Sequence, residues 1–206
     1  LSTIFTVFCV IGLTNSFNFI DGVDGLCGGL FLISLSTLLI FAYISQTYYL
    51  FEDLELILIL LITIILFLIF NMSSKFKIFL GDSGSMTLGF MMAWFLILYT
   101  QVYQVIHPVL AMWCVTLTTF DIITVVIRRI LRNKNPFKPD RRHIHHLLLD
   151  RGGSHYAVTI IILIIASLFN MLGIFTLHNY GPLVSLSVYF ILFIAYFLTN
   201  IKLSRK

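Results

Sequence analysis

One long uncharged stretch limits, more than any other feature, what this chain can fold into. Residues 28–51 contain no Asp, Glu, Lys or Arg and are mostly apolar. A helix needs about 20 apolar residues to cross a bilayer, and a strand needs about 10 with alternating polarity. The stretch is continuous rather than alternating, which favours a helix. Only 11% of all residues are charged, against about 25% in soluble domains. We therefore expect an all-α, polytopic transmembrane helix bundle.

Further apolar runs predict how often the chain crosses the membrane. We expect a partial amino-terminal span at residues 1–13 and six full spans at residues 28–51, 56–71, 86–106, 109–127, 156–177 and 183–201. The first run ends before Asn15 and is shorter than the roughly 20 residues that a span requires. We therefore interpret residues 1–206 as a single integral-membrane domain from which amino-terminal helices are missing.

The positive charges predict which ends of the spans share a side of the membrane. All 13 Lys and Arg residues fall in residues 73–85, 128–155 and 202–206, which alternation of the spans places on one side together with residues 14–27. The other side holds residues 52–55, 101–108 and 178–182. These loops contain no Lys or Arg, and their charged residues are Glu52, Asp53 and Glu55. Positively charged loops stay in the cytoplasm, so we expect the first side to be cytoplasmic.

A glycine-rich segment on the expected cytoplasmic side carries a carboxylate. It reads Gly81-Asp82-Ser83-Gly84-Ser85 and lies between two spans. Glycines allow the backbone to approach a ligand closely, and Mg²⁺ prefers carboxylate oxygens shared with substrate phosphates. We consider two interpretations, a metal-binding turn and a helix-entry turn with Asp82 as the cap.

Four polar residues at a regular spacing precede the first full span. Asn15, Asn18, Asp21 and Asp24 recur every three residues, which on a helix gives one slowly drifting face. Two Asp-Gly pairs make a continuous helix past Asp21 unfavourable. We expect the segment to leave the membrane there and to present polar groups that hold a metal, a ribose or a sugar. The alternative is a cap and turn at a membrane exit.

Three histidines follow a basic segment, Asp140-Arg141-Arg142, in the longest polar loop. His143, His145 and His146 are interpreted as hydrogen-bond donors to phosphate oxygens, alongside the arginines. Zinc binding and a basic patch for anionic lipid headgroups are the alternatives. Asp121 lies inside an expected span, and an ion pair with an Arg of the next loop would account for it.

These three motifs, in this order, resemble the polyprenyl-phosphate N-acetylhexosamine-1-phosphate transferases. Ile144, which interrupts the histidines, favours the bacterial undecaprenyl-phosphate branch that uses UDP-N-acetylhexosamine. The resemblance covers essentially the whole chain and corresponds to the carboxy-terminal part of the family. An aspartate-rich motif on an earlier loop of the family is not among these residues, so the implied activity is expected of a longer chain.

The resemblance also implies roles for individual residues. Asp82 matches the family's Mg²⁺ ligand, with Asn18 as a second ligand, and Mn²⁺ is an alternative ion. The catalytic residues it implies are Asp82, Asp21, Asp24, His143, His145 and His146. The implied substrate-binding residues are Asn15, Asn18, Arg129, Arg141 and Arg142.

The function expected from the resemblance is transfer of an N-acetylhexosamine 1-phosphate from a UDP-sugar to undecaprenyl phosphate, with release of UMP. The expected partners are these two substrates and membrane lipids, without nucleic acid, and a homodimer is left open. The expected location is the bacterial cytoplasmic membrane, with the active site facing the cytoplasm. A phospho-muramoyl-pentapeptide transferase and a non-catalytic lipid-anion-binding protein or transporter are the alternatives.

Overall fold

The protein is a helical bundle, seen in a computed structural model that describes residues 2–47, 54–135 and 142–204. No strand occurs in these ranges. The helices, in chain order, are α1 (Ser2–Ile20), α2 (Leu26–Ile44), α3 (Leu54–Asn71), α4 (Gly81–Ile97), the π-helical turn η2 (Leu98–Val102), α5 (Pro108–Cys114), α6 (Thr116–Leu131), α7 (Ile144–Leu149) and α8 (His155–Leu203). The expected all-α, polytopic fold class is confirmed.

Five of these helices are long and apolar enough to cross a membrane, and a sixth crossing results if α5 and α6 count as one span. The expected partial span at residues 1–13 is too short, because the helical window continues from Thr3 to Ile20. The polar residues Asn15 and Asn18 lie within this helix, and the turn begins at Asp21. The outer faces of α1 and α3 carry large exposed apolar side chains, as expected of surfaces in contact with lipid.

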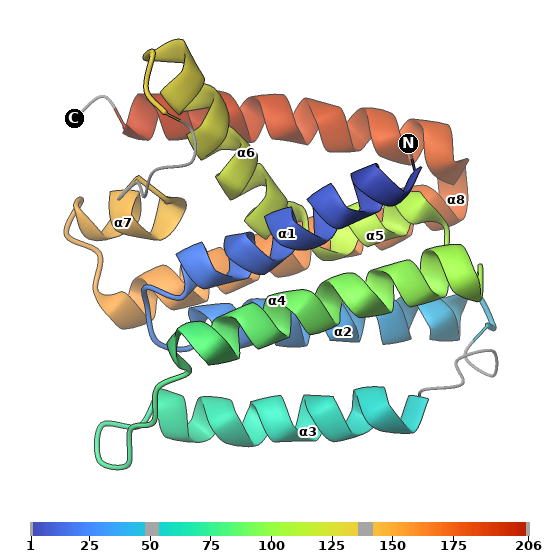
Figure 1. Cartoon of the computed structure of the whole chain (residues 1–206), viewed down its shortest axis with the longest axis horizontal. Helices are drawn as coiled ribbons and strands as arrows, with labels where there is room; N and C mark the ends of the chain where they lie inside the picture. The colour runs from blue at the N-terminus through green and yellow to red at the C-terminus, as the bar shows by residue number, and fades with distance from the viewer. Residues whose placement is uncertain (1, 48–53, 136–141, 205–206) are drawn as a thin grey trace.

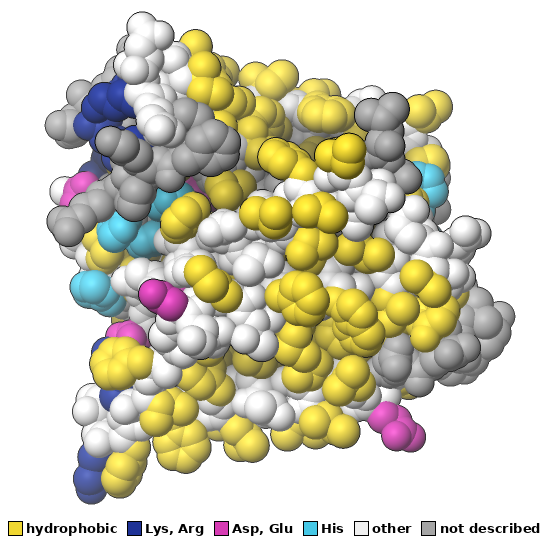
Figure 2. Space-filling view, in the orientation of Figure 1, with side chains coloured by type: hydrophobic (Ala, Val, Ile, Leu, Met, Phe, Trp, Pro, Cys, Tyr) yellow, Lys and Arg dark blue, Asp and Glu magenta, His cyan; other side chains and the backbone are white. Residues whose placement is uncertain are grey.

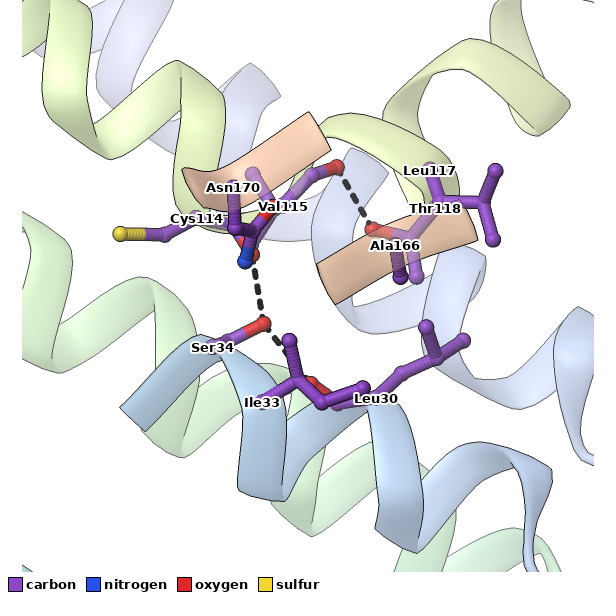
Figure 3. Close-up of a pocket in the computed structure, with 9 residues that line it drawn as sticks. All are labelled: Leu30, Ile33, Ser34, Cys114, Val115, Leu117, Thr118, Ala166 and Asn170. Atoms are coloured by element: carbon purple, nitrogen blue, oxygen red, sulfur yellow. Dashed lines mark hydrogen bonds between the residues drawn. The ribbon is translucent and has the colours of Figure 1, made fainter. Parts of the chain in front are cut away.

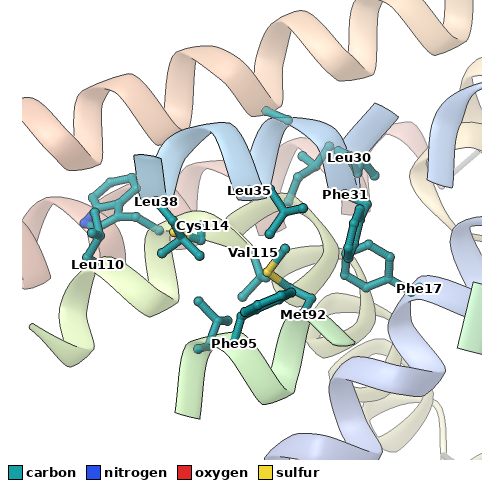
Figure 4. Packing of buried hydrophobic residues seen from close by; sticks show 14 of the residues in the cluster. Phe17, Leu30, Phe31, Leu35, Leu38, Met92, Phe95, Leu110, Cys114 and Val115 are labelled. Carbon is teal, nitrogen blue, oxygen red and sulfur yellow. The ribbon is translucent and has the colours of Figure 1, made fainter. Parts of the chain in front are cut away.

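The bundle is held together by a continuous apolar core (Figure 4). Phe17 of α1 meets Phe31 of α2 edge to face, with ring centroids 6.4 Å apart. Met92 and Phe95 reach the same core from α4. Because lipid tails are as apolar as these side chains, close packing rather than exclusion from water stabilises such contacts.

The chain is sharply bent where a single span was expected. Residues 109–127 form α5 and α6, which meet at an angle of 78° around Val115. The expected span is thus broken, and α5 with α6 makes one crossing if the bent pair is counted together. Broken helices at membrane depth require partners for their free carbonyl groups. Figure 3 shows one such partner, the Ser34 hydroxyl, which donates to the Cys114 carbonyl across 2.6 Å.

Helix α8 consists of two arms that run in opposite directions (Figure 1). The helical backbone is interrupted at Gly181, with φ 81° and ψ 177°, directly before Pro182. This left-handed φ suits glycine. The two arms correspond to the spans expected at residues 156–177 and 183–201, and the indole of Trp113 donates to Ser185 across 2.8 Å to attach the second arm.

The loops that carry the three motifs lie at one end of the bundle, which we call the polar end. It comprises residues 21–25, 72–80, 132–135 and 142–154, together with the first turn of α4 and the last turns of α6 and α8 (Figure 1). The Lys and Arg atoms visible in Figure 2 all gather there, while hydrophobic side chains are spread over the middle of the face in view. The grouping of loops expected from the positive charges is thus confirmed.

Candidate functional site

The turn after α1 is tied to three other parts of the chain. Lys77, from the loop before α4, forms an ion pair with Asp24 at 2.6 Å. Thr159 of α8 donates to the Asp24 carbonyl across 2.8 Å. Asn71 of α3 accepts a hydrogen bond from the Gly25 amide at 2.6 Å and donates to the Ile78 carbonyl at 2.8 Å. The turn that carries Asp21 and Asp24 is therefore positioned by tertiary contacts.

The side chains of Asn15 and Asn18 lie within α1, whereas the carboxylates of Asp21 and Asp24 lie in the turn that follows it. The Asn15 side chain donates to the carbonyl of Ile11 across 2.7 Å, so its amide is used within its own helix. Asn18 is partly exposed at the last turn of α1, and its backbone carbonyl accepts a hydrogen bond from the backbone amide of Asp21. Of the two, Asn18 lies closer to the polar end.

Asp82 lies in the first turn of α4 and its side chain is exposed. Interpreting it as the helix cap is wrong, because Leu80 occupies the cap position and no side chain caps the helix. Burial, together with the carboxylates of Asp82 and Asp24, raises the pKa of Asp21 to about 6. The fold therefore brings together three acidic side chains whose negative charges act on one another.

No group of three or more His, Cys, Asp or Glu side chains within the described ranges is arranged to hold a metal ion. The acidic side chains at the polar end therefore do not form a closed coordination shell. Asp24 is already engaged with Lys77, whereas Asp21 and Asp82 have no ion pair with any residue in the described part of the chain. Carboxylate oxygens of this kind suit Mg²⁺, which usually keeps several waters and is shared with substrate phosphates.

The histidines pack directly against the turn that follows α1. The ring of His143 stacks between Phe19 and His145, with centroid distances of 5.6 and 6.0 Å. His145 is fully buried, and neither ring nitrogen has a hydrogen-bond partner. Burial, with a smaller contribution from the adjacent His146 and His143, lowers the pKa of His145 to about 3 despite the opposing effect of Asp121. His145 is therefore a neutral imidazole near pH 7.

A glycine allows this close approach. A Cβ atom at Gly22 would lie 2.6 Å from Nε2 of His145, closer than side chains tolerate. The Asp-Gly segment and the histidine segment, more than 120 residues apart in the chain, are thus adjacent. The two segments, which were expected on the same side of the membrane, therefore lie side by side.

Asp121 is bound by the histidine loop, and no arginine in the described ranges forms an ion pair with it. Its Oδ2 lies 2.7 Å from Nδ1 of His143, and its Oδ1 accepts from the amide of Ile144 at 2.9 Å and from the hydroxyl of Tyr196 at 3.0 Å. The interpretation as an ion pair with an Arg was wrong. The sequence singled out Asp121 because it is a carboxylate inside an expected span. The positions of the Arg and His residues along the chain did not identify its partner.

Five cationic side chains line an open pocket at the same end, with a volume of about 100 Å³. They are Arg128, Arg129, Arg132, Lys134 and Arg142. Arg128 donates to Asn200 and to the Arg142 carbonyl, and Arg129 donates to the Asn135 carbonyl. Arg141, also expected at the site, lies outside the described residues. A pocket of this charge suits phosphate groups.

Lys77, Asn71 and Tyr196 are contacts of the site that the sequence did not point to. In the sequence, Lys77 served only as one of the positive charges that group the loops by side of the membrane. Asn71 served only as the last residue of an expected span. Each gains its role from a partner distant in sequence, such as Asp24 for Lys77.

The sequence of this chain is similar to those of known proteins. Residues 1–100 match the model of glycosyl transferase family 4. The undecaprenyl-phosphate alpha-N-acetylglucosaminyl 1-phosphate transferase of Escherichia coli K12 is 34% identical over 207 residues, covering 97% of this chain and 54% of the relative. The protein of the same name from Yersinia pestis is 34% identical, covering 82% of this chain and 47% of the relative.

A more distant bacterium provides a similar match. The probable undecaprenyl-phosphate N-acetylglucosaminyl 1-phosphate transferase of Bacillus subtilis is 36% identical, over 92% of this chain and 52% of the relative. The chain thus spans about half the length of the curated relatives it matches. No solved structure matches it significantly. By sequence, residues 1–100 match glycosyl transferase family 4, and the chain is similar over almost its whole length to bacterial undecaprenyl-phosphate N-acetylglucosaminyl 1-phosphate transferases.

Proposed function

We propose that the protein transfers an N-acetylhexosamine 1-phosphate, with N-acetylglucosamine as the favoured sugar, from a UDP-sugar to undecaprenyl phosphate and releases UMP. The observation that carries this proposal is the convergence of Asp21 and Asp82 with the histidine loop at the polar end. Burial and the neighbouring carboxylates of Asp82 and Asp24 raise the pKa of Asp21, and Gly22 packs against His145. The names of the relatives support the acceptor and the sugar.

In the proposed reaction, a phosphate oxygen of the lipid acceptor attacks the phosphorus that is linked to the sugar. A new P–O bond forms, the bond between the two phosphates of the UDP-sugar breaks, and UMP leaves. Such transfers depend on positioning and on neutralising charge. The acceptor phosphate is largely dianionic at neutral pH because its second pKa is about 6, so no protein side chain has to remove a proton from it.

The described residues contribute to the proposed reaction by neutralising phosphate charge and by positioning the substrates. Arg129 and the other cations of the basic pocket would neutralise non-bridging phosphate oxygens. His143 offers one ring nitrogen beyond its contact with Asp121. Asp21 and Asp24 act as positioning groups, because Asp24 is paired with Lys77 and both sit on a turn held by neighbouring helices.

We assign the cofactor to Mg²⁺, with Asp82 and Asn18 as ligands and Mn²⁺ as an alternative ion. The donor set fits, because exposed carboxylate and amide oxygens are the ligands Mg²⁺ prefers. The excess negative charge that raises the pKa of Asp21 would also be relieved by a divalent cation. When bound, the ion supplies Lewis-acid stabilisation of the diphosphate and of the leaving UMP.

We also propose that the polar end faces the cytoplasm of a bacterial plasma membrane. All the Lys and Arg residues in the described ranges lie on that side, as the positive-inside rule requires of cytoplasmic loops. The lipid-facing surfaces of the bundle would let the polyprenyl chain stay in the bilayer while its phosphate reaches the polar end.

The test is UMP release by the protein, expressed from its complete reading frame and purified in detergent, with undecaprenyl phosphate and UDP-N-acetylglucosamine. We expect lipid-dependent release that EDTA abolishes and Mg²⁺ restores. No release from folded protein with a panel of UDP-N-acetylhexosamines would contradict the proposal.

The metal role of Asp82 is tested with Asp82→Asn. We expect a loss of turnover of at least about 100-fold, as for removal of other groups that stabilise charge in a transition state, with an unchanged unfolding midpoint. Glu55→Gln is the matched control, because Glu55 is also in the first turn of a helix but at the opposite end of the bundle. Retained activity in Asp82→Asn would refute its role.

A further inference from the structure

Asp121 is a carboxylate inside the bundle that the proposed chemistry does not yet use. The residue is 2% exposed, and its two carboxylate oxygens contact three groups from the histidine loop and α8. A buried carboxylate carries a large desolvation cost unless its oxygens accept hydrogen bonds. The contacts of Asp121 meet that requirement, and two of the three come from His143 and Ile144.

The contact with His143 determines where the imidazole carries its proton. An ionised carboxylate only accepts hydrogen bonds. Because Oδ2 lies 2.7 Å from Nδ1 of His143, the proton belongs on Nδ1. Nε2, the other nitrogen, has no hydrogen-bond partner among the described residues. The ring cannot turn freely, since it is stacked between Phe19 and His145.

The same helix holds the backbone on both sides of His143. Asp121 accepts from the Ile144 amide, and Arg128 donates to the Arg142 carbonyl at 2.8 Å. Asp121 and Arg128 are seven residues apart on α6 and so lie on the same face, two turns apart. On α8, the residues Tyr196 and Asn200, four apart, bind the same two side chains.

We propose that Asp121 is a positioning residue that orients His143, so that Nε2 is presented to a phosphate group of the substrates at the polar end. Asp121 does not touch substrate and acts through the imidazole. When a phosphate oxygen approaches, Nε2 takes up one proton from the solvent; the resulting imidazolium donates a hydrogen bond to the phosphate, and the buried carboxylate stabilises its positive charge. This inference rests on the proposed function, because it assigns a role within the same site.

The kinetic test compares Asp121→Asn, His143→Ala and the double variant by UMP release. The amide keeps the size of the side chain and an acceptor for the Ile144 amide, but it turns an N–H toward Nδ1 and favours the opposite tautomer. We expect kcat to fall on the order of 10- to 100-fold, as for other outer partners of functional histidines, while KM for the UDP-sugar changes little. The double variant should lose no more than His143→Ala. Additive losses would overturn the proposal.

Tyr196→Phe separates positioning from simple stabilisation. It removes a hydrogen bond to the same carboxylate but none to His143. We expect a lower unfolding midpoint with a much smaller loss of kcat than in Asp121→Asn. Equal losses of kcat in the two variants would assign Asp121 a purely structural role and overturn the proposal.

A spectroscopic measurement tests the contact without turnover, and it remains informative if Asp121→Asn fails to fold. In protein labelled with ¹⁵N-histidine, the His143 signals are identified by their loss in His143→Gln. We expect Nδ1 to be protonated and hydrogen-bonded in the unliganded protein. An Nε2–H tautomer would overturn the proposal. Protein with the expected tautomer but no UMP release with any UDP-sugar would instead contradict the proposed function.

Discussion

At the scale of single residues, the candidate site depends on a glycine packed against a buried histidine. Gly22 belongs to the turn that carries Asp21 and Asp24, and the His145 ring occupies the space where a side chain at this position would begin. His145 is fully buried and flanked by the rings of His143 and His146, so it has little room to move. The absence of a Cβ atom is therefore what lets the two segments approach each other.

Gly22→Ala should push the turn and the histidine loop apart. We expect a loss of about 1–3 kcal/mol in unfolding free energy, which is typical of overpacking, together with lower UMP release. The control is Gly12→Ala in α1, where nothing lies within 4 Å of the added atom and Ala favours the helix. Thermal unfolding in detergent compares the two variants, and equal effects would show that the contact with His145 is unimportant.

At the scale of elements, the bend between α5 and α6 places Asp121 beside the histidine loop. The bend at Val115 frees carbonyl groups at the end of α5 in the interior of the bundle. The Ser34 hydroxyl donates to the Cys114 carbonyl, and the Asn170 amide, in either orientation, donates to Cys114 or Trp113. Helices α2 and α8 thus supply the hydrogen bonds that the broken span lacks.

Ser34→Ala should destabilise this bend. It leaves the Cys114 carbonyl without its shortest hydrogen bond in a buried position, which costs about 1–3 kcal/mol. Ser167→Ala is a matched control, because the Ser167 hydroxyl donates only to Leu163 in its own helix. The unfolding midpoint should fall in the first variant and stay nearly constant in the second. Equal midpoints would indicate that the bend does not depend on Ser34.

At the scale of the whole molecule, the bundle separates a polar end from an apolar middle. Reversals of the chain at residues 21–25, 72–80 and 150–154 bring the acidic turn, the loop with Lys77 and the histidine loop to one end. A lipid-linked phosphate and a water-soluble nucleotide sugar can meet only where the bilayer ends. This separation is therefore what the proposed reaction requires.

The orientation is tested with single cysteines in a Cys9→Ser background, since Cys27 and Cys114 are buried. Lys75→Cys and Ser154→Cys report on the polar end, and Gln46→Cys and Gln104→Cys on the opposite end. We expect an impermeant maleimide to label the first pair in inverted vesicles and the second pair in intact cells. The reverse pattern would contradict a cytoplasmic site.

The all-α, polytopic fold class and the grouping of the loops at the two ends of the bundle were predictable from the sequence. Apolar runs of about 20 residues must form helices in a bilayer, because lipid offers no partners for backbone groups. The Lys and Arg residues in alternate loops then indicated which ends of the spans lie on the same side of the membrane. The sequence also predicted that the helix would end at Asp21, since the two Asp-Gly pairs disfavour its continuation. These properties depend on residues that are close together in the chain, so the sequence is sufficient to predict them.

Only the tertiary structure decided which polar groups meet. Asp121 was expected to pair with an arginine but binds His143, and Lys77 proved to be the partner of Asp24. The bend at Val115 was not predicted, because its carbonyls are satisfied by residues of α2 and α8. Such contacts join residues as many as 135 positions apart, as between Thr159 and Asp24. The pairing of polar groups in an apolar bundle depends on which helix faces pack together, and no local pattern in the chain records that choice.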